Sequence, residues 1–284
     1  MMKIIETISQ MTEWSKAAKS RGEKIAFVPT MGALHSGHLA LVRLAKEKAS
    51  QVVVSIFVNP LQFGPTEDFE RYPRPLKKDI ALLEGEEVPL LFLPSAIEMY
   101  SKGFQTVVHL NKLTQNLCGK MRPGHFDGVA AVVLKLFQIV KPEVAVFGNK
   151  DYQQRRLLEQ MVSDLNLDIE IVALPIVREP DGLAMSSRNA YLTEDERKRA
   201  TILFHSLKKA QELCDGGEKR ASEIVACVSQ MIDSQRPTKV DYISVCDAMT
   251  LQEVDRIDKP ALLAVAVTFG KTRLIDNVVL EPNK

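Results

Sequence analysis

The sequence has 284 residues, of which 45% are hydrophobic and 26% charged, close to the usage of an average globular protein. Its 37 Lys and Arg nearly balance its 36 Asp and Glu, and the resulting formal charge of +1 argues against a broad nucleic-acid-binding surface. At about 150 residues per domain, the length predicts two domains.

The cysteines and the N-terminal segment indicate in which cellular compartment the protein is expected. Four Cys are scattered without a CxxC pair, a pattern that fits neither a disulfide framework nor a zinc ribbon: Cys118, Cys214, Cys227 and Cys246. We expect free, buried thiols in a reducing compartment. Residues 1–14 lack the apolar core of a signal peptide, and no apolar run approaches the roughly 20 residues of a membrane span. We therefore expect a soluble cytoplasmic protein without a membrane partner.

Five apolar runs in the first two-thirds of the chain are nearly continuous, which is typical of strands buried on both faces of a parallel sheet. These runs are 24–28, 52–58, 88–93, 144–147 and 169–173. Helical patterns occupy 37–49, 76–83, 128–140 and 152–165. The alternation predicts a Rossmann-like, doubly wound α/β fold with ligands at the carboxyl ends of the strands.

The pattern changes after about residue 177. Thr193 and Glu196 have the spacing of a capping box, which predicts the start of a helix over 194–214. A second helix is predicted over 221–232, followed by strands at 240–245, 262–268 and 273–279. We expect a first domain over 1–177 and a smaller α+β domain, acting as a lid, over 178–284. The turn-rich segment 178–182 is the candidate hinge.

The segment 27–38 joins the first of these apolar runs to the helix that follows it and is the most informative part of the chain. Gly32 and Gly37 have the spacing of a phosphate loop, but His38 and Leu39 stand where a Walker A motif has Lys and Ser or Thr. His35-x-Gly-His38 remains, at a helix N-terminus whose free N–H groups favour a phosphate. Two imidazoles there could donate hydrogen bonds to a transition state. Two alternatives are that the histidines only cap the helix, or that they bind a metal.

Six motifs together resemble those of one family. They are 28–38 (VPTMGALHSGH), 54–63 (VSIFVNPLQF), 122–126 (RPGHF), 147–154 (FGNKDYQQ), 181–189 (DGLAMSSRN) and 274–277 (LIDN). The first is similar to the HxGH form of the HIGH motif of the nucleotidylyltransferase superfamily. In this order, the set resembles the pantoate–β-alanine ligase (pantothenate synthetase) family over nearly the whole chain.

The resemblance implies an amide-forming reaction in two steps. ATP and pantoate would give pantoyl adenylate and pyrophosphate with the help of Mg²⁺, and β-alanine would then displace AMP to give pantothenate. Such an enzyme must stabilise a phosphoryl transition state and keep water from the mixed anhydride. A related nucleotidyltransferase acting on another small acceptor is the alternative, followed by a non-catalytic ATP-binding protein on the same fold.

The resemblance also implies an ATP site. Its residues are Met31, Gly32, Ala33, Leu34, His35, Ser36, Gly37, His38, Gly148, Asn149, Lys150, Asp151, Val177, Met185, Ser186, Ser187 and Arg188. Those expected to be catalytic are His38, His35, Lys150, Ser186, Ser187 and Arg188. Lys150 would bind the triphosphate, Asp151 the ribose, and Val177 the adenine. Met185–Arg188 resembles the KMSKS loop of the superfamily and suits the β- and γ-phosphates.

For pantoate, Gln62 and Gln154 match the binding glutamines of the family, and Gln62 is also the candidate for β-alanine. Asn59, Tyr72 and His125 are second-rank candidates.

Two positions depart from the family pattern. Asn149 stands in place of the usual Glu, and Asp127 in place of the usual Arg, so Asp127 is left out of the site.

Acidic residues that could bind Mg²⁺ are Glu67, Asp68 and Asp79, but the sequence assigns no metal ligand. The resemblance further suggests a homodimer.

Overall fold

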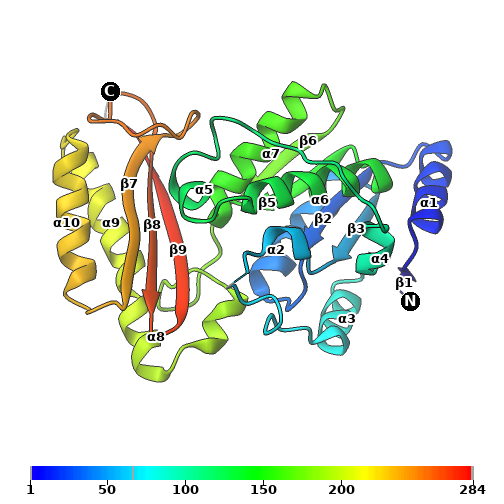
Figure 1. Ribbon diagram of the computed structural model, residues 1–284, viewed down its shortest axis with the longest axis horizontal. Helices are drawn as coiled ribbons and strands as arrows, with labels where there is room; N and C mark the ends of the chain where they lie inside the picture. Colours follow the sequence, from blue (N-terminus) through cyan, green and yellow to red (C-terminus); the bar gives the residue numbers. More distant parts are fainter. Residues whose placement is uncertain (1, 66, 283–284) are drawn as a thin grey trace. The chain divides into compact units, whose positions relative to one another are not determined.

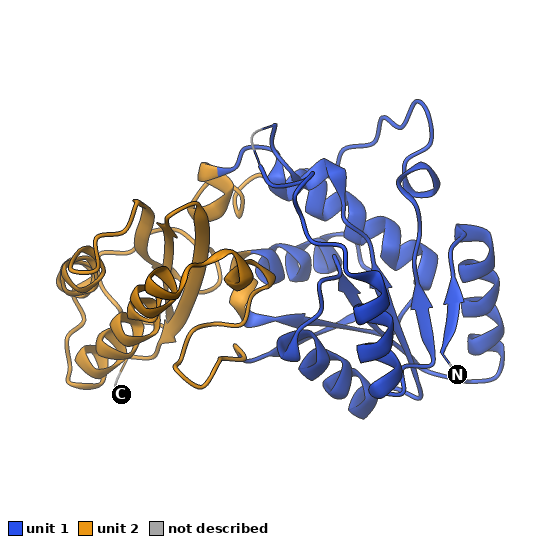
Figure 2. Cartoon of the chain, turned by 90° about the horizontal axis from the view of Figure 1, so that it is seen from below, with its two compact units in different colours: residues 1–110, 122–149, 154–175 blue, residues 111–121, 150–153, 176–284 orange. Residues whose placement is uncertain are grey.

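The computed structural model describes residues 2–65 and 67–282. The chain divides into two compact units (Figure 2). Unit 1 comprises residues 1–110, 122–149 and 154–175, and unit 2 comprises residues 111–121, 150–153 and 176–284. The predicted domain boundary after Val177 stays a prediction.

Unit 1 is built on a six-stranded parallel sheet in the order β1-β4-β3-β2-β5-β6 (Figure 1). The strands are β1 (Lys3–Ile5), β2 (Ile25–Thr30), β3 (Gln51–Ile56), β4 (Leu90–Phe92), β5 (Val144–Gly148) and β6 (Glu170–Leu174). The predicted doubly wound parallel sheet is confirmed. The chain leaves β2 toward β3 on one side and returns as β5 on the other, so the switch point of the sheet lies between β2 and β5.

Helices flank this sheet, and their bounds are α1 (Ile8–Ser20), α2 (Ser36–Lys48), α3 (Leu76–Gly85), α4 (Ala96–Met99), α6 (His125–Val140) and α7 (Tyr152–Asp164). On one face, Val42 of α2 and Leu83 of α3 share a buried core with Val28 and Val54. Alternate residues of the strands face the other way. There, Phe137 of α6 packs edge-on against Phe27 and Phe147, with ring centroids 6.5 Å apart in both pairs. This double cover is why the strands read as continuous apolar runs.

Unit 2 contains an antiparallel sheet in the order β7-β8-β9 (Figure 1). Its strands are β7 (Lys239–Asp247), β8 (Ala261–Phe269) and β9 (Thr272–Leu280), and its helices are α5 (Leu117–Met121), α8 (Glu194–Ala200), α9 (Ile202–Asp215) and α10 (Ala221–Asp233). Leu207 of α9 and Ile224 of α10 pack with Val265 of β8 in one buried core. The predicted α+β character of this part is confirmed.

Several features differ from the sequence prediction. The helix expected over 194–214 is interrupted at Thr201, whose hydroxyl donates to the carbonyl of Lys198 and competes with the helical pattern. β1 and α1 are not predicted, because a three-residue strand carries too short a pattern. β6 lies at the sheet edge and its residues are partly exposed, although strands buried on both faces are expected.

Two other expectations can be compared with the structure. The four thiols are free, with Cys214 and Cys246 buried and Cys118 and Cys227 half-buried. Within residues 2–65 and 67–282, no helix is both long and apolar enough to cross a bilayer.

Candidate active site

The loops that follow β2 and β5 begin at neighbouring strand ends. β2 pairs with β5 in parallel. The carboxyl end of β2 leads into the loop 31–35, while β5 ends at Gly148 and leads into Asn149. This is the switch point of the sheet, where doubly wound folds bind their ligands. The fold therefore places the HxGH loop and the start of the second predicted ATP segment at the same edge of unit 1.

Asp79 holds the loop after β2 in an unusual backbone conformation. Gly32 has φ of 79° and Ala33 has φ of 49°, both in the left-handed region. The two carboxylate oxygens of Asp79, a residue only 1% exposed, accept hydrogen bonds from the N–H groups of Ala33 and Leu34, each at 2.8 Å. A Cβ on Gly32 would lie 3.0 Å from Ile56 Cγ2. Asp79 thus fixes the loop through its backbone N–H groups.

The two histidines of HxGH form a capping box at the start of α2. His35 Nδ1 accepts from Gly37 N at 3.2 Å, and His38 Nδ1 accepts from His35 N at 3.4 Å. Because both rings use Nδ1 as an acceptor, a neutral imidazole in either position carries its proton on Nε2. The ring centroids are 4.1 Å apart. The capping alternative is therefore confirmed, and a neutral ring in either position still carries an Nε2–H donor.

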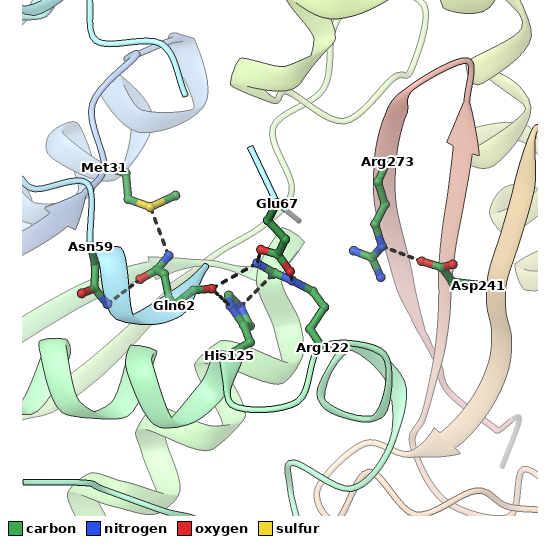
Figure 3. A network of polar contacts seen from close by, with 8 residues as sticks. All are labelled: Met31, Asn59, Gln62, Glu67, Arg122, His125, Asp241 and Arg273. Atoms are coloured by element: carbon green, nitrogen blue, oxygen red, sulfur yellow. Dashed lines mark hydrogen bonds and ion pairs between the residues drawn. The ribbon is translucent and has the colours of Figure 1, made fainter. Parts of the chain in front are cut away.

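Gln62 lies at the end of the short helix η1 (Pro60–Gln62) and is held by neighbouring side chains (Figure 3). Its side-chain oxygen accepts from Asn59 Nδ2 at 3.1 Å, and its Nε2 lies 3.1 Å from Met31 Sδ. Asn59 Oδ1 accepts from the Tyr100 hydroxyl at 2.7 Å. Burial raises the pKa of Tyr100, which keeps the phenol protonated as a donor. Gln62 is thus joined through Met31 to the loop 31–35.

A second group of residues fixes the main chain of Gln62 (Figure 3). His125 Nδ1 lies 2.7 Å from the Gln62 carbonyl oxygen, and His125 Nε2 lies 3.0 Å from Arg122 Nη1. The arginine can only donate, so His125 accepts at Nε2 and donates from Nδ1. Arg122 also donates to both carboxylate oxygens of Glu67, through Nε at 2.7 Å and through Nη2. Burial acts to raise the pKa of Glu67, but Arg122 outweighs it and leaves that pKa below its ordinary value.

Gly128 allows η1 to lie directly against α6. A Cβ at this position would stand 2.2 Å from the carbonyl oxygen of Leu61, and the Gly128 carbonyl accepts from Asn59 Nδ2 at 3.0 Å. The neighbouring Asp127 pairs with His109 at 2.8 Å. Tyr72 is buried, edge-on to Phe63, and Gln154 is half-buried in the first turn of α7.

The predicted ATP residues of unit 2 lie in two segments. Lys150 and Asp151 belong to the short helix η2 (Asn149–Asp151), while Ser187 and Arg188 begin η3 (Ser187–Tyr191). Burial lowers the pKa of Lys150, and the positive charge of Arg188 lowers it further, against the opposing charges of Asp151 and Asp276. Lys150 and Arg188 are therefore close enough to interact electrostatically.

The segment around Met185–Arg188 is fixed by local hydrogen bonds. Ser186 Oγ caps η3 by accepting from Arg188 N at 3.2 Å. Met185 N donates to the Val177 carbonyl at 3.0 Å, which joins the two ends of the turn 177–185. The candidate hinge 178–182 is thus a closed antiparallel turn, with a bridge between Arg178 and Ala184.

A sequence model described as pantoate–β-alanine ligase matches residues 3–279. The chain belongs to the pantoate–β-alanine ligase family. A pantothenate synthetase of Caldicellulosiruptor bescii is 52% identical over 280 residues, which cover 99% of each chain. Another, of Thermotoga neapolitana, is 53% identical over 279 residues, or 98% of this chain and 100% of the relative.

Solved structures agree with the sequence comparison. Pantothenate synthetase from Thermus thermophilus superposes with a TM-score of 0.93 at 44% identity, covering 99% of this chain and 100% of the other. A pantoate–β-alanine ligase from Francisella tularensis, complexed with β,γ-ATP and β-alanine, has a TM-score of 0.80 at 36% identity and 98% coverage of both chains. The fold and the family predicted from the six motifs are confirmed.

The sequence does not identify some residues that fix the loops of the candidate site. Asp79 and Glu67 are offered there only as metal candidates, but both are engaged within unit 1 by loop N–H groups and by Arg122. Tyr100 carries no motif at all. An acidic residue in the first turn of a helix is ordinary, so no local pattern marks Asp79 as the residue that holds a loop 45 positions away.

Proposed function

We propose that this chain condenses (R)-pantoate with β-alanine at the expense of ATP, giving pantothenate, AMP and pyrophosphate through pantoyl adenylate. The observation that carries the proposal is membership of the ligase family over residues 3–279, combined with two oriented imidazoles at the switch point of the sheet. A carboxylate is a poor acyl donor, and its adenylation makes AMP the leaving group.

The first step is attack of the pantoate carboxylate on the α-phosphorus of ATP. His38 and His35 donate from Nε2 to phosphate oxygens as negative charge develops, supported by the N-terminus of α2. Residues 31–38 lie along the nucleotide in this proposal. The left-handed turn at Gly32 and Ala33, whose N–H groups donate to Thr30 and Asp79, fixes the course of this loop.

Unit 2 supplies charge for the departing pyrophosphate. We assign Lys150, Ser186, Ser187 and Arg188 to the triphosphate and Asp151 to the ribose. Met185 and Val177 are assigned to the nucleotide as well, with Val177 at the adenine. The Lys150 ammonium and the Arg188 guanidinium repel each other until a polyanion binds, and this repulsion favours ATP over an uncharged nucleoside.

Gln62 and Gln154 are assigned to pantoate. An amide can donate to a carboxylate and accept from a hydroxyl, which matches a 2-hydroxy acid. Gln62 is also assigned to β-alanine, because both substrates react at the same carbonyl carbon. The contacts that fix its side chain and its main chain support a precisely placed amide.

The residues present do not fit a Mg²⁺ site built by the protein. Asp79 and Glu67 are engaged by loop N–H groups and by Arg122, and no three His, Cys, Asp or Glu side chains gather as metal ligands within residues 2–65 and 67–282. We propose that Mg²⁺ arrives with ATP as the substrate complex, held mainly by phosphate oxygens.

We further propose that the enzyme is a homodimer of the cytoplasm, as the family resemblance suggests. Light scattering on the purified chain should give about twice its 31.7 kDa. A mass near that of one chain would contradict the dimer.

One assay tests the reaction. The protein is incubated with ATP, Mg²⁺, pantoate and β-alanine, and AMP and pantothenate are followed together. Equal amounts of both, each dependent on β-alanine in multiple turnover, are expected. AMP without pantothenate would instead favour a related nucleotidyltransferase that acts on another acceptor.

A further inference from the structure

The motif Leu274–Asn277 on β9 has no role in the proposed function, yet it places two buried polar residues next to each other. Asp276 is 2% exposed and Asn277 is 7% exposed, in a strand that otherwise packs against apolar cores. Burying polar groups is costly unless they are hydrogen-bonded, so their partners indicate what they are for.

Asp276 anchors the turn that leads into the Met185–Arg188 loop. Its two carboxylate oxygens accept from Arg178 Nη1 at 2.6 Å and Nη2 at 3.0 Å, a bidentate pair. Arg178 also donates to the Gly182 carbonyl at 3.1 Å and lies over the Phe204 ring at 4.8 Å. This carboxylate and its arginine therefore tie the turn 177–185 to β9.

Asn277 anchors the other ATP segment of unit 2. Its Nδ2 donates to the Lys150 carbonyl at 2.9 Å. Successive side chains of a strand point to opposite faces. Accordingly, Leu274 belongs to the core under α9 and α10, whereas Val279 packs with the cluster around Tyr152, next to η2. The two neighbouring residues thus reach two different segments from opposite faces of β9.

We propose that Asp276 and Asn277 are positioning residues that set the spacing between Lys150 and the Met185–Arg188 loop by fixing both segments to β9. This inference rests on the proposed function, because it takes both segments to bind ATP. The chemistry favours the arrangement, since charged donors act on a polyphosphate only when their separation matches it. A three-stranded antiparallel sheet is a stiffer reference for two cationic groups than the loops that carry them.

Calorimetric titration of the full chain with ATP and Mg²⁺, without pantoate, tests the proposal. Asn277→Ala removes the donor to Lys150, and the Kd for ATP should rise about fivefold, the scale of one lost hydrogen bond. Asn277→Asp keeps the size but not the donor and should lose at least as much. In steady state, the KM for ATP should rise in both variants while the KM for pantoate stays unchanged.

Val278→Ala is the matched control on the same strand. Val278 packs against the apolar core under α9 and α10 and makes no part of the contact to Lys150. This variant should lower the melting temperature while leaving the Kd for ATP unchanged. Equal weakening by Val278→Ala and Asn277→Ala, or normal ATP binding by both Asn277 variants, would overturn the positioning role.

Asp276→Asn gives a second reading, because it removes the charge that Arg178 pairs with. A folded variant should show a raised KM for ATP. If this variant does not fold, the two Asn277 variants decide whether the positioning role holds. Failure of the unaltered chain to bind ATP would overturn the inference. ATP binding without pantothenate formation would instead overturn the proposed function and leave the positioning test intact.

Discussion

The predicted site residues of unit 1 and those of unit 2 differ in their chemistry. The groups that unit 1 offers are neutral: two imidazoles and the amide of Gln62. Its nearby charges, Asp79, Glu67 and Arg122, are used up in hydrogen bonds that fix loops. Unit 2 instead offers cations, with Lys150 and Arg188 close enough to affect each other.

This difference suggests that the residues of unit 1 orient the reacting groups, whereas those of unit 2 provide the charge that binds ATP. In the proposed function, the neutral groups of unit 1 orient the reacting carboxylate and α-phosphate without attracting either one strongly. The cationic groups proposed to bind the triphosphate respond to pH and salt. Variants in unit 1 should therefore lower the rate of adenylation, whereas variants in unit 2 should change the affinity for ATP and its dependence on pH.

His38→Ala should have the largest effect. Adenylate formation, measured as pantoate-dependent pyrophosphate release, should fall on the order of 10²-fold or more, the scale for losing a transition-state donor. The capping box is also lost, which should cost about 1 kcal/mol of stability. His109→Ala, which removes an exposed imidazole of the same unit, should leave the rate unchanged. A folded His38→Ala variant with a near-normal rate would contradict the assigned role.

Asp79→Ala should have the second-largest effect, because it removes the hydrogen bonds that hold the loop after β2 rather than a catalytic group. The N–H groups of half-buried Ala33 and buried Leu34 would lose their acceptors, which should lower the free energy of unfolding by about 2–4 kcal/mol. Asp79→Asn keeps one acceptor and should lose about half as much. Denaturant unfolding measures both, with the exposed Glu84→Ala on the same helix as control. Unchanged stability in Asp79→Ala would show that the loop holds its conformation without the carboxylate.

The same residue shows where sequence reasoning reaches its limit. Continuous apolar runs predict the parallel strands, and the HxGH spacing predicts which loop lies at a strand end, because both patterns are local. Nothing local links Asp79 to Leu34, or Arg122 to Glu67 across 55 residues. The helix is interrupted at Thr201 because its hydroxyl donates to the Lys198 carbonyl rather than to solvent, and no local pattern predicts this. The family resemblance supplies roles for Gln62 and Lys150, but not the residues that hold them.

Lys150→Arg should change the pH dependence of ATP binding. Burial lowers the pKa of Lys150 below its ordinary 10.5, so the unaltered chain should lose ATP affinity as the pH rises through this lowered value. The loss should reach at most about tenfold per pH unit, the limit for one linked proton. Arginine stays protonated, so the loss should move to higher pH.

Calorimetric titration with ATP between neutral and alkaline pH measures this limb. The exposed Lys208→Arg is the matched control and should behave like the unaltered chain. An identical alkaline limb in Lys150→Arg would mean that another group, rather than this ammonium, controls the affinity for the triphosphate.

Asn149→Glu should have the smallest effect. It tests the position where a neutral residue directly precedes the cationic Lys150. The variant restores the Glu that is usual in the family, directly before Lys150. A nearby carboxylate favours the ammonium form, so the alkaline loss of ATP affinity should move to higher pH. We expect kcat/KM for ATP to stay within about threefold, because one partly solvated charge pair contributes at most about 1 kcal/mol. A loss of more than tenfold in kcat/KM would show that the amide of Asn149 itself contacts the substrate. The neutral groups of the site would then include the residue directly before Lys150.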